Sequence, residues 1–425
     1  MARLSNDCFA HDGALTGLGA ALGGLLGRLQ PVAAAETLPL AACAGRALAE
    51  PVAAQRSVPP HDNSAVDGYA VFHADLSPDG ETRLPVAGRA AAGHPLAAGQ
   101  ARSSAVLVLT GAPMPAGIAG QPGPDTVLMQ EDCRLEDGQV VIPPSIARGA
   151  NRRLAGEDIR AGAAMLAAGR RLTPADLALA AAAGHAVLPV FRPLRIALLS
   201  TGDELHQAGA ALPPGGIHDA NRPLLAALLA RTGCVVSDLG IQPDRRDHLA
   251  AVFAAAARDH DAIVTSGGVS GGAEDHVKDA IAAAGGQLHM WRLAIRPGKP
   301  VALGQIGAVP VFGLPGNPVA AALTFAFFAG PLLQRLGGYV PLRPRGYPVT
   351  ADFAWDKKPG RREWLRVSLR DDGAGGWLAQ PYPVDGSGIL TSLTRSDGVI
   401  ELAEDSTGLR PGDRVVFYGF EGLGL

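Results

Sequence analysis

Acidic side chains follow short apolar segments at several places in the second half of the chain. These residues are Glu204, Asp219, Asp244 and Asp275. Carboxylates held close together raise one another's pKa unless a cation offsets their charge. Oxygen ligands beside phosphates suit Mg²⁺, which takes one or two carboxylates and keeps several waters. The pattern therefore predicts a magnesium site, and the alternative is that these acids cap helices or lie in solvated loops.

Two loops in the same half have the composition of a phosphate-binding site. The loop 266–272 is rich in glycine, so its backbone N–H groups can approach a phosphate, and a helix that follows adds its positive end. Such a loop can also be a mobile surface loop, but its place between a strand and a helix favours a ligand. The turn 201–204 follows another apolar segment, although Thr201 or Asp203 could simply cap the next helix.

A basic cluster lies in the segment 291–300. It consists of Arg292, Arg296 and Lys299, in a turn that two prolines and a glycine stiffen. Cations held near backbone N–H groups suit an oxyanion, and the alternative is a charged surface turn. The segment 59–71 and the shorter segments 110–113 and 156–159 are dense in turn-forming residues, from which alone no function follows.

The elements that must position these groups begin at Leu194, where strands and helices alternate. Expected strands are 195–200, 234–241, 261–265, 288–295 and 309–312, and expected helices are 222–232, 246–259, 275–284 and 319–336. This alternation predicts a parallel sheet built from βαβ units. Ligands of such sheets bind beyond the carboxyl ends of the strands. The loops 201–204, 266–272 and 313–318 are therefore expected to converge on one cleft.

The rest of the chain divides into further units, because 425 residues are too many for one core and suggest about three domains. Leucines spaced three and four residues apart over 15–29 predict an amphipathic helix rather than a signal peptide. Residues 51–145 are rich in Pro and Gly and predict a β-rich domain, and Thr173-Pro174 opens a helix closed by Gly184. Segments 364–369 and 377–380 flank a turn, which predicts a hairpin in a small β-barrel.

Composition excludes several classes of partner. The formal net charge of −3 gives no broad attraction to nucleic acid or anionic lipid, and no apolar run approaches the length of about 20 residues that spans a membrane. The four cysteines form no CxxC pair, so neither a zinc site nor a disulfide framework is expected. A reducing cytoplasm fits this cysteine usage.

Seven short strings occur in one order along most of the chain. They are DNSAVDGYAV at 62–71, TGAPMP at 110–115, GEDI at 156–159, STGDEL at 200–205, SGGVS at 266–270, RPGKP at 296–300 and GLPGNPV at 313–319. Together they resemble the molybdopterin molybdenumtransferase family, to which the E domain of gephyrin belongs. One such string could arise by chance, whereas seven collinear strings are highly specific.

The resemblance implies a multidomain α/β protein that forms homodimers. Its parts would be a discontinuous N-terminal helical domain (1–50 and 146–190), an inserted β-rich domain (51–145), a central three-layer α/β domain that binds molybdopterin (191–338) and a small C-terminal β-barrel (339–425). It also implies the last common step of molybdenum cofactor biosynthesis, in which molybdate is inserted into molybdopterin adenylate with Mg²⁺ and AMP is released. Implied partners are the molybdopterin adenylyltransferase and recipient molybdoenzymes.

Site residues are carried over by position in the matching strings. The nucleotide and metal site falls on Glu204, Asp219, Asn221, Asp244, Gly267, Gly268, Ser270, Asp275 and Lys278, with Glu204, Asp244 and Asp275 as metal ligands. The oxyanion site falls on Arg296, Lys299, Pro300, Arg366 and Ser387, with Arg292 nearby, and Pro315 and Pro318 also contact substrate. The resemblance also implies catalytic roles for the three metal ligands and for Asp67, Thr110 and Asp158, and it implies that the latter three complete the cleft across the dimer interface. No covalent protein nucleophile is expected.

The chain departs from the family pattern at three places. Ala273 stands where an acid is frequent and Glu274 follows it, Ala320 stands where Ser is common, and arginines at 292 and 296 replace lysines. Two other functions stay open from the residues. A molybdopterin adenylyltransferase shares the α/β module but resembles that module alone, and a non-catalytic scaffold could use the same fold.

Overall fold

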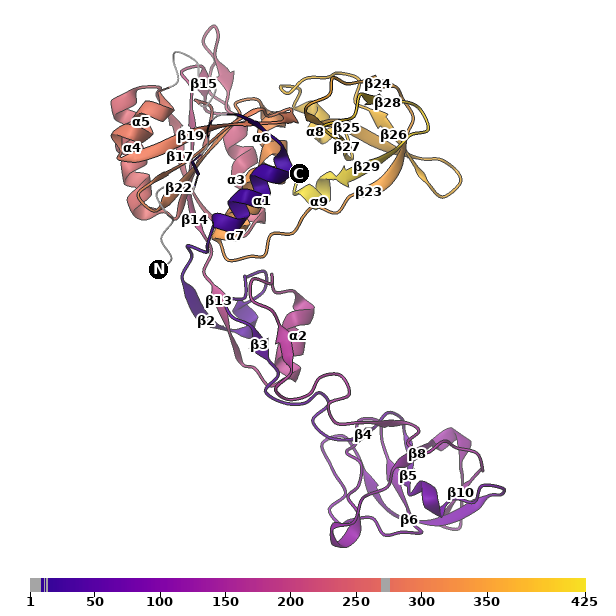
Figure 1. Cartoon of the computed structure of the whole chain (residues 1–425). Helices are drawn as coiled ribbons and strands as arrows, with labels where there is room; N and C mark the ends of the chain where they lie inside the picture. The colour runs from indigo at the N-terminus through magenta and orange to yellow at the C-terminus, as the bar shows by residue number, and fades with distance from the viewer. Residues whose placement is uncertain (1–8, 11, 13, 269–275) are drawn as a thin grey trace.

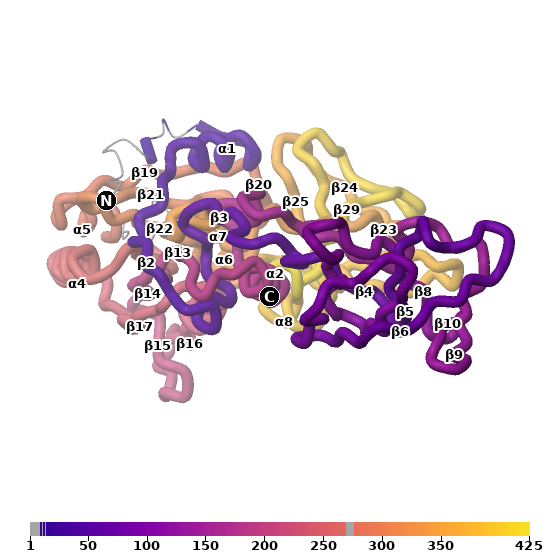
Figure 2. The backbone as a smooth tube through the Cα atoms, turned by 90° about the horizontal axis from the view of Figure 1, so that it is seen from below, coloured from indigo at the N-terminus to yellow at the C-terminus, as the bar shows by residue number. Residues whose placement is uncertain are grey.

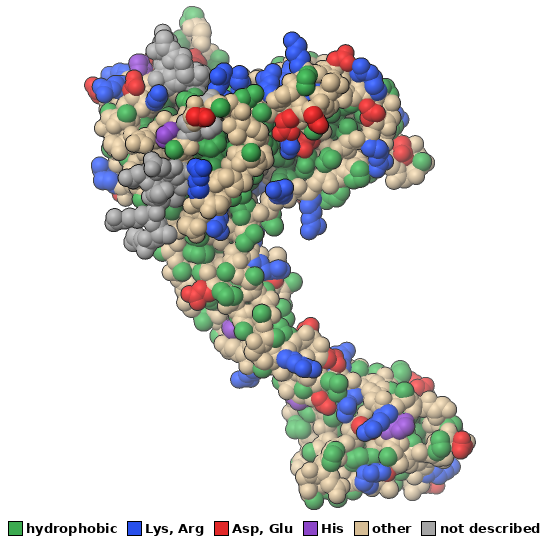
Figure 3. All heavy atoms as spheres, viewed as in Figure 1, with side chains coloured by type: hydrophobic (Ala, Val, Ile, Leu, Met, Phe, Trp, Pro, Cys, Tyr) green, Lys and Arg blue, Asp and Glu red, His purple; other side chains and the backbone are tan. Residues whose placement is uncertain are grey.

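The computed structural model describes residues 9–10, 12, 14–268 and 276–425, and it has an elongated shape. Figure 1 shows the α/β domain and the C-terminal barrel side by side at one end of the molecule. A narrow stalk leads from them to the β-rich domain at the other end. Figure 3 shows basic and acidic side chains interspersed on the face in view, without a broad patch of one sign.

The α/β domain is built on a seven-stranded sheet. The strand order is β1 (Leu15–Thr16), β19 (Gly286–Leu293), β21 (Pro300–Ile306), β22 (Val309–Leu314), β18 (Ala262–Ser266), β14 (Arg195–Thr201) and β17 (Val235–Gln242). Helices α3 (Asn221–Arg231), α6 (Pro318–Thr324) and α7 (Gly330–Leu336) cover one face, and α4 (Arg246–Asp259) and α5 (Val277–Ala283) cover the other. Along β14, Ile196 and Leu198 belong to the first core and Ala197 and Leu199 to the second. This alternation confirms the three-layer architecture.

The expected parallel sheet is in fact mixed. Strands β22, β18, β14 and β17 run parallel, but β21 runs antiparallel to both β19 and β22. The sequence reading missed β21 because its first residue is Pro300, which was assigned to a stiff basic turn. The two strands β21 and β22 form a hairpin around Gly307, whose φ of 59° suits glycine.

The expected helix 319–336 forms but changes its winding in the middle. Between α6 and α7, residues Phe325–Ala329 form a π-helix (η5), just before Pro331. Proline has no N–H to donate to the helix ladder, which accounts for the change of winding there. The whole segment Pro318–Leu336 is long and apolar enough to cross a membrane, but 83% of its most apolar window is buried inside the described protein. It is the central helix of a core.

The N-terminal helix α1 (Leu18–Arg28) packs against α7 and contributes to the core of the α/β domain. Figures 1 and 2 both show it beside that domain. The discontinuous domain that was expected to be helical is therefore mainly a ladder of paired strands. Its pairs are β2 (Ala35–Pro39) with β13 (Val187–Phe191) and β3 (Val52–Ala53) with β12 (Ala164–Leu166). The helix expected after Thr173 is confirmed as α2 (Pro174–Ala182), with Thr173 and Asp176 forming a capping box.

The β-rich domain and the barrel complete the chain. A six-stranded sheet in the β-rich domain has the order β8 (Thr126–Met129), β5 (Gly68–Val71), β7 (Ala105–Val108), β6 (Thr82–Ala90), β10 (Gln139–Ile142) and β9 (Arg134–Glu136). The paired strands β4 (Asn63–Ser64) and β11 (Arg152–Arg153) connect it to the stalk. Barrel strands are β23 (Tyr347–Ala351), β25 (Arg362–Asp371), β26 (Trp377–Pro381), β27 (Gly398–Leu402) and β29 (Arg414–Gly419). Because β25 also pairs with β27, these strands close on themselves, and β25 and β26 form the expected hairpin.

One strand joins the barrel to the α/β domain. After β19 ends at Leu293, the chain leaves the seven-stranded sheet and forms β20 (Ile295–Arg296), which pairs in parallel with β25 of the barrel. The expected strand 288–295 is thus two strands in two sheets. This crossing places Arg296 opposite Glu363.

Candidate active site at the carboxyl edge of the sheet

A cleft of about 340 Å³ lies where strands β14, β18 and β22 end. Its lining residues are Thr201, Glu204, Leu205, Ile217, His218, Asp219, Ala220, Asn221, Ser266, Gly267, Gly316, Asn317, Pro318, Gly388 and Leu390. The turn 201–204, the start of the glycine loop and the loop 313–318, called the GNP loop after its residues Gly316, Asn317 and Pro318, therefore meet at one cleft. This is expected of loops at the carboxyl ends of parallel strands. Gly388 and Leu390 come from the barrel, so two domains form the walls.

Asn221 ties two sides of the cleft together at the start of α3. Its Nδ2 donates to Ser266 Oγ at 2.7 Å and to the carbonyl oxygen of Gly316 at 2.6 Å. Its Oδ1 and the Oγ1 of Thr201 are buried and have no hydrogen-bond partner among the described residues. Buried oxygens without partners are costly, so these two acceptors suit a ligand or a bound cation.

Asp219 lines the cleft and also holds the first turn of α3. Its Oδ1 accepts the backbone N–H groups of Asn221 and Arg222, each at 3.1 Å, and its Oδ2 accepts Arg222 Nε at 3.1 Å. Arg222 is buried and also donates to Gln207 and Asp238. The sequence reading missed Arg222, whose role depends on partners that are distant in the chain.

The two described glycines of the loop are required by packing. Gly267 and Gly268 have φ values of 86° and 63°, and a Cβ on Gly267 would lie 2.5 Å from the carbonyl oxygen of Thr201. A Cβ on Gly268 would lie 2.4 Å from Val277 Cγ2. These two glycines therefore lie directly against β14 and α5, where a side chain would not fit.

The expected metal ligands are described only in part, since Asp275 and the nearby Ser270 lie outside the described residues. Glu204 is exposed at the cleft, with its carboxylate over Gly202, and Asp244 donates its backbone N–H to Asp203 Oδ1 at 3.2 Å. Among residues 9–10, 12, 14–268 and 276–425, no group of three His, Cys, Asp or Glu side chains is placed to hold a metal. The metal site formed by Glu204, Asp244 and Asp275 stays a prediction.

The expected oxyanion residues meet at the contact between the α/β domain and the barrel. Arg296 Nη1 donates to Glu363 Oε1 and its Nη2 to Asp385 Oδ2, both at 2.7 Å. Arg366 Nη2 donates to Asp385 Oδ1 at 3.3 Å and to the carbonyl oxygen of Gly386 at 3.2 Å. Burial raises the pKa of Glu363 above its ordinary value, and the nearby Arg296 opposes that rise only in part. Sequence reasoning identified both arginines but neither acid.

Ser387 connects this contact to the cleft. Its Oγ accepts Asn317 Nδ2 at 2.9 Å, and its carbonyl oxygen accepts the N–H of Val319 at 3.0 Å. The segment 385–388 thus reaches from the arginines to the GNP loop, and Gly388 at its end lines the cleft. The structure brings Arg296, Arg366 and Ser387 together as expected from the family resemblance.

The other expected contacts lie around this arrangement. Arg292 is exposed on β19 opposite Pro300, and the carbonyl oxygen of Lys299 accepts the N–H of Leu293. Pro318 opens α6 and lines the cleft, whereas Pro315 is buried in the loop before it. Lys278 is exposed in the first turn of α5.

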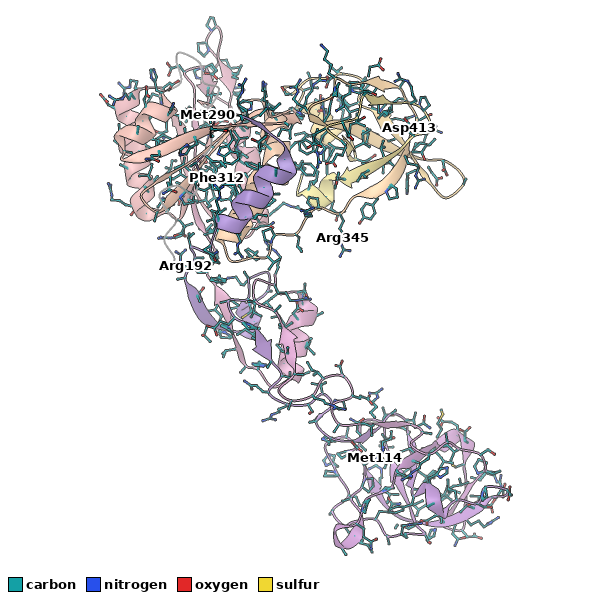
Figure 4. All side chains as sticks on the ribbon, viewed as in Figure 1. Met114, Arg192, Met290, Phe312, Arg345 and Asp413 are labelled. Carbon is teal, nitrogen blue, oxygen red and sulfur yellow. The ribbon has the colours of Figure 1, made fainter. Side chains whose placement is uncertain are left out.

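Asp67, Thr110 and Asp158 lie away from the cleft within one chain. Asp67 Oδ1 accepts the backbone N–H of Thr110 at 2.6 Å and its hydroxyl at 2.8 Å, and these bonds hold the pKa of Asp67 below its ordinary value. Asp158 is exposed at the junction of stalk and β-rich domain. In Figure 4, Met114 of the same string as Thr110 and Phe312 of β22 lie at opposite ends of the molecule. A single protomer does not bring these three residues to the cleft.

A larger hollow, about 790 Å³, lies in the β-rich domain and is lined by Phe72, Arg102, Arg148 and Arg152 among others. Its arginines are engaged by acids of the same domain: Arg102 by Asp75, Arg148 by Asp125 and Arg152 by Asp62. Size alone therefore does not identify the site. The smaller cleft at the sheet edge has the unpartnered oxygens and the contribution from a second domain.

Comparison with known proteins covers every domain of the chain. Residues 18–184 match the MoeA N-terminal region (domain I and II), 197–335 the probable molybdopterin binding domain and 348–420 the MoeA C-terminal region (domain IV). The molybdopterin molybdenumtransferase of Haemophilus influenzae is 36% identical, over 91% of this chain and 94% of its own length. Molybdopterin molybdenumtransferase 2 of Mycobacterium tuberculosis is also 36% identical, over 87% of this chain and 91% of its own.

The crystal structure of a molybdopterin biosynthesis MoeA protein from Pyrococcus horikoshii has a TM-score of 0.76 and 30% sequence identity, covering 96% of this chain and 99% of that one. The fold and the cleft thus define a multidomain protein built around a molybdopterin-binding domain. The chain belongs to the molybdopterin molybdenumtransferase family.

Proposed function

We propose that the chain inserts molybdate into adenylylated molybdopterin with release of AMP, using the cleft at the edge of the sheet. Membership of the family makes the chain a transferase of molybdenum cofactor biosynthesis. The match over 91% of the chain favours this enzyme over the adenylyltransferase and the scaffold. One observation carries the placement: a loop of the barrel that contacts two arginines also lines the cleft where three strands of the α/β domain end.

The residues of the cleft divide the work of binding and positioning. The glycine loop and the start of α3 hold the phosphates of the adenylate, and Asn221 keeps the two sides of the cleft at a fixed separation. Arg296 and Arg366 offer guanidinium groups to the molybdate beside it, and Ser387 lies between the two sites. Basic side chains offset the charge that develops on phosphate as the bond to AMP breaks. An oxygen of molybdate or of water attacks the phosphorus of the AMP group, and the P–O bond to the molybdopterin phosphate breaks. Where the oxygen belongs to molybdate, its bond to molybdenum breaks as the dithiolene sulfurs bind the metal, so the oxygen leaves with AMP. No protein nucleophile is used.

The donors at the cleft fit a hard divalent cation. Glu204 lines the cleft, and Asp244 donates its backbone N–H to Asp203, which is in the same turn as Glu204, so both can supply carboxylates. Thr201 Oγ1 and Asn221 Oδ1 are buried oxygens without partners among the described residues. Such an all-oxygen set is the kind that Mg²⁺ takes, and Glu204, Asp244 and Asp275 would hold it. When bound, the ion would stabilise negative charge on the pyrophosphate.

The surroundings of the reaction follow from the same proposal. Within one protomer Asp67, Thr110 and Asp158 are far from the cleft, so a homodimer would let a second copy deliver them. Cys43, Cys133 and Cys234 are free thiols, as suits a cytoplasmic enzyme. The adenylyltransferase would supply the substrate, and recipient molybdoenzymes would take the product.

The test is to incubate the pure protein with molybdopterin adenylate and Mg²⁺, with and without molybdate, and to follow AMP. We expect AMP release that depends on molybdate. Glu204→Gln should lower the rate at least about tenfold, because it removes a carboxylate that would hold Mg²⁺ beside the pyrophosphate. Glu131→Gln changes an exposed acid of the β-rich domain and should keep the wild-type rate. Release of AMP at the same rate without molybdate would contradict the proposal.

A further inference from the structure

At the contact between the α/β domain and the barrel, where the oxyanion residues meet, there are as many acids as arginines. Arg296 and Arg366 are matched by Glu363 and Asp385. Molybdate is a dianion, and it gains little from cations whose charge is already offset by neighbouring carboxylates. For molybdate to bind at these arginines, one of the two acids must therefore move away from them.

The two acids differ in how firmly they are held. The side chain of Glu363 is 5% exposed, and its residue lies within strand β25. The side chain of Asp385 is 39% exposed and lies on the connection between β26 and α8 (Thr391–Thr394). A carboxylate that is already partly hydrated loses little when it moves fully into water, so Asp385 is the acid that can leave.

The position of Asp385 is that of a bridging anion. One of its oxygens accepts Arg296 Nη2 and the other accepts Arg366 Nη2. Two oxygens of a tetrahedral oxyanion can make the same pair of contacts. The side chain of Arg366 is only 5% exposed, so its buried guanidinium needs an anionic partner whether Asp385 is present or not.

We propose that Asp385 is an internal counter-anion that occupies the molybdate position, and that molybdate binds by displacing it from Arg296 and Arg366. This inference rests on the proposed placement of molybdate at these arginines. Asp385 then sets how tightly molybdate binds. Because Gly386, Ser387 and Gly388 follow it directly, its displacement also moves the segment that lines the adenylate cleft.

The test measures molybdate binding by calorimetry at low ionic strength, with the full chain and without adenylate. We expect Asp385→Asn to lower the Kd for molybdate about fivefold, which is the scale of one partly exposed ion pair. Asp385→Ser should act in the same direction, and Asp385→Glu, which keeps the charge, should bind like the wild type. Asp352→Asn is the matched control, because Asp352 pairs with Arg370 in the same barrel at 3.1 Å and should leave the Kd unchanged.

The outcomes separate this inference from the proposed function. If the wild type binds molybdate and both neutral variants bind it equally or more weakly, Asp385 does not compete with molybdate and the inference is wrong. The proposed function would still stand, because it is tested separately by molybdate-dependent release of AMP. If Arg366→Gln leaves molybdate binding intact, the anion site lies elsewhere, and both the placement and the inference are overturned.

Discussion

Asp67 and Thr110 are 43 positions apart in the chain, yet one carboxylate oxygen accepts both donors of the threonine. The pair joins the strings at 62–71 and 110–115, which on residue types alone were turns without a function. An ionised, well-oriented carboxylate at an exposed point of the β-rich domain is what a group that acts on a second protomer would require.

Thr110→Val should raise the pKa of Asp67 toward the ordinary value of about 3.9, because it removes the hydroxyl donor and keeps the backbone N–H. The folded pKa of Asp67 is depressed, so its contribution to stability is present above the unfolded pKa and is lost as the pH falls through the folded one. An NMR titration of the Asp67 carboxyl checks the shift. Asp372, whose pKa is lowered by the backbone N–H groups of Gly376 and Ala374, is an internal control that should not change. Equal pKa values in wild type and variant would contradict this account.

The residues of the site that sequence could predict are those in compact strings. Glu204, Gly267 and Pro318 stand in loops directly after strands or at the start of a helix, and they line one cleft. Glu363 and Asp385 could not be found in this way. Both acids pair with Arg296, which reaches them only because the chain passes from the seven-stranded sheet into the barrel sheet at β20.

The sequence predicted those helices and strands that depend on local residue patterns, and it missed those that depend on contacts between distant parts of the chain. Helix α4 was predicted with its observed bounds because its apolar residues repeat on one face and its ends are polar. Strand β21 was missed, since a proline at its start and basic residues before it are typical of a turn. The end of β19 was misplaced, because an apolar run does not tell where a chain leaves one sheet for another.

The turn before β21 depends on a glycine that fits against a helix. Gly298 has a φ of 105°, and a Cβ there would lie 2.2 Å from Thr324 Oγ1 at the end of α6. Gly298→Ala should therefore lower the free energy of unfolding by more than about 2 kcal/mol, from backbone strain and overlap together. Gly307→Ala is the matched control, with a φ of 59° and nothing within 4 Å of the new Cβ, and should cost about 1 kcal/mol. Urea unfolding measures both, and equal losses would show that the overlap is relieved without cost.

At the scale of the whole molecule, domain order followed from the sequence but the placement of the domains did not. The Pro and Gly content of residues 51–145 predicted the β-rich domain, and the turn between 364–369 and 377–380 predicted a hairpin of the barrel. Nothing in the periodicity of α1, which ends at Arg28, indicated that it packs against α7, which begins at Gly330, because an amphipathic helix does not specify its partner.

The separation of Asp67 from the cleft leads to a test of the proposed homodimer. If a second protomer delivers Asp67 to the cleft, coexpressed Asp67→Asn and Glu204→Gln chains should regain activity. Random pairing makes half of the dimers mixed, with one intact cleft in each, so about a quarter of wild-type AMP release is expected. Glu204→Gln mixed with Asn221→Ala is the control, because both changes lie in the same cleft and each mixed dimer has two damaged clefts. No recovery in the first mixture would place all catalytic groups within one chain.

The stalk has a further consequence for how this protein can be altered. Along it the outgoing and returning chain stay paired, through β2 with β13, β3 with β12 and finally β4 with β11, where Asn63 lies opposite Arg153. Paired antiparallel residues are about 5 Å apart, so the β-rich domain is an inserted domain whose two ends lie next to each other. Another domain with adjacent termini could replace the β-rich domain at that point, and the strands of the α/β domain and the barrel would keep their pairing.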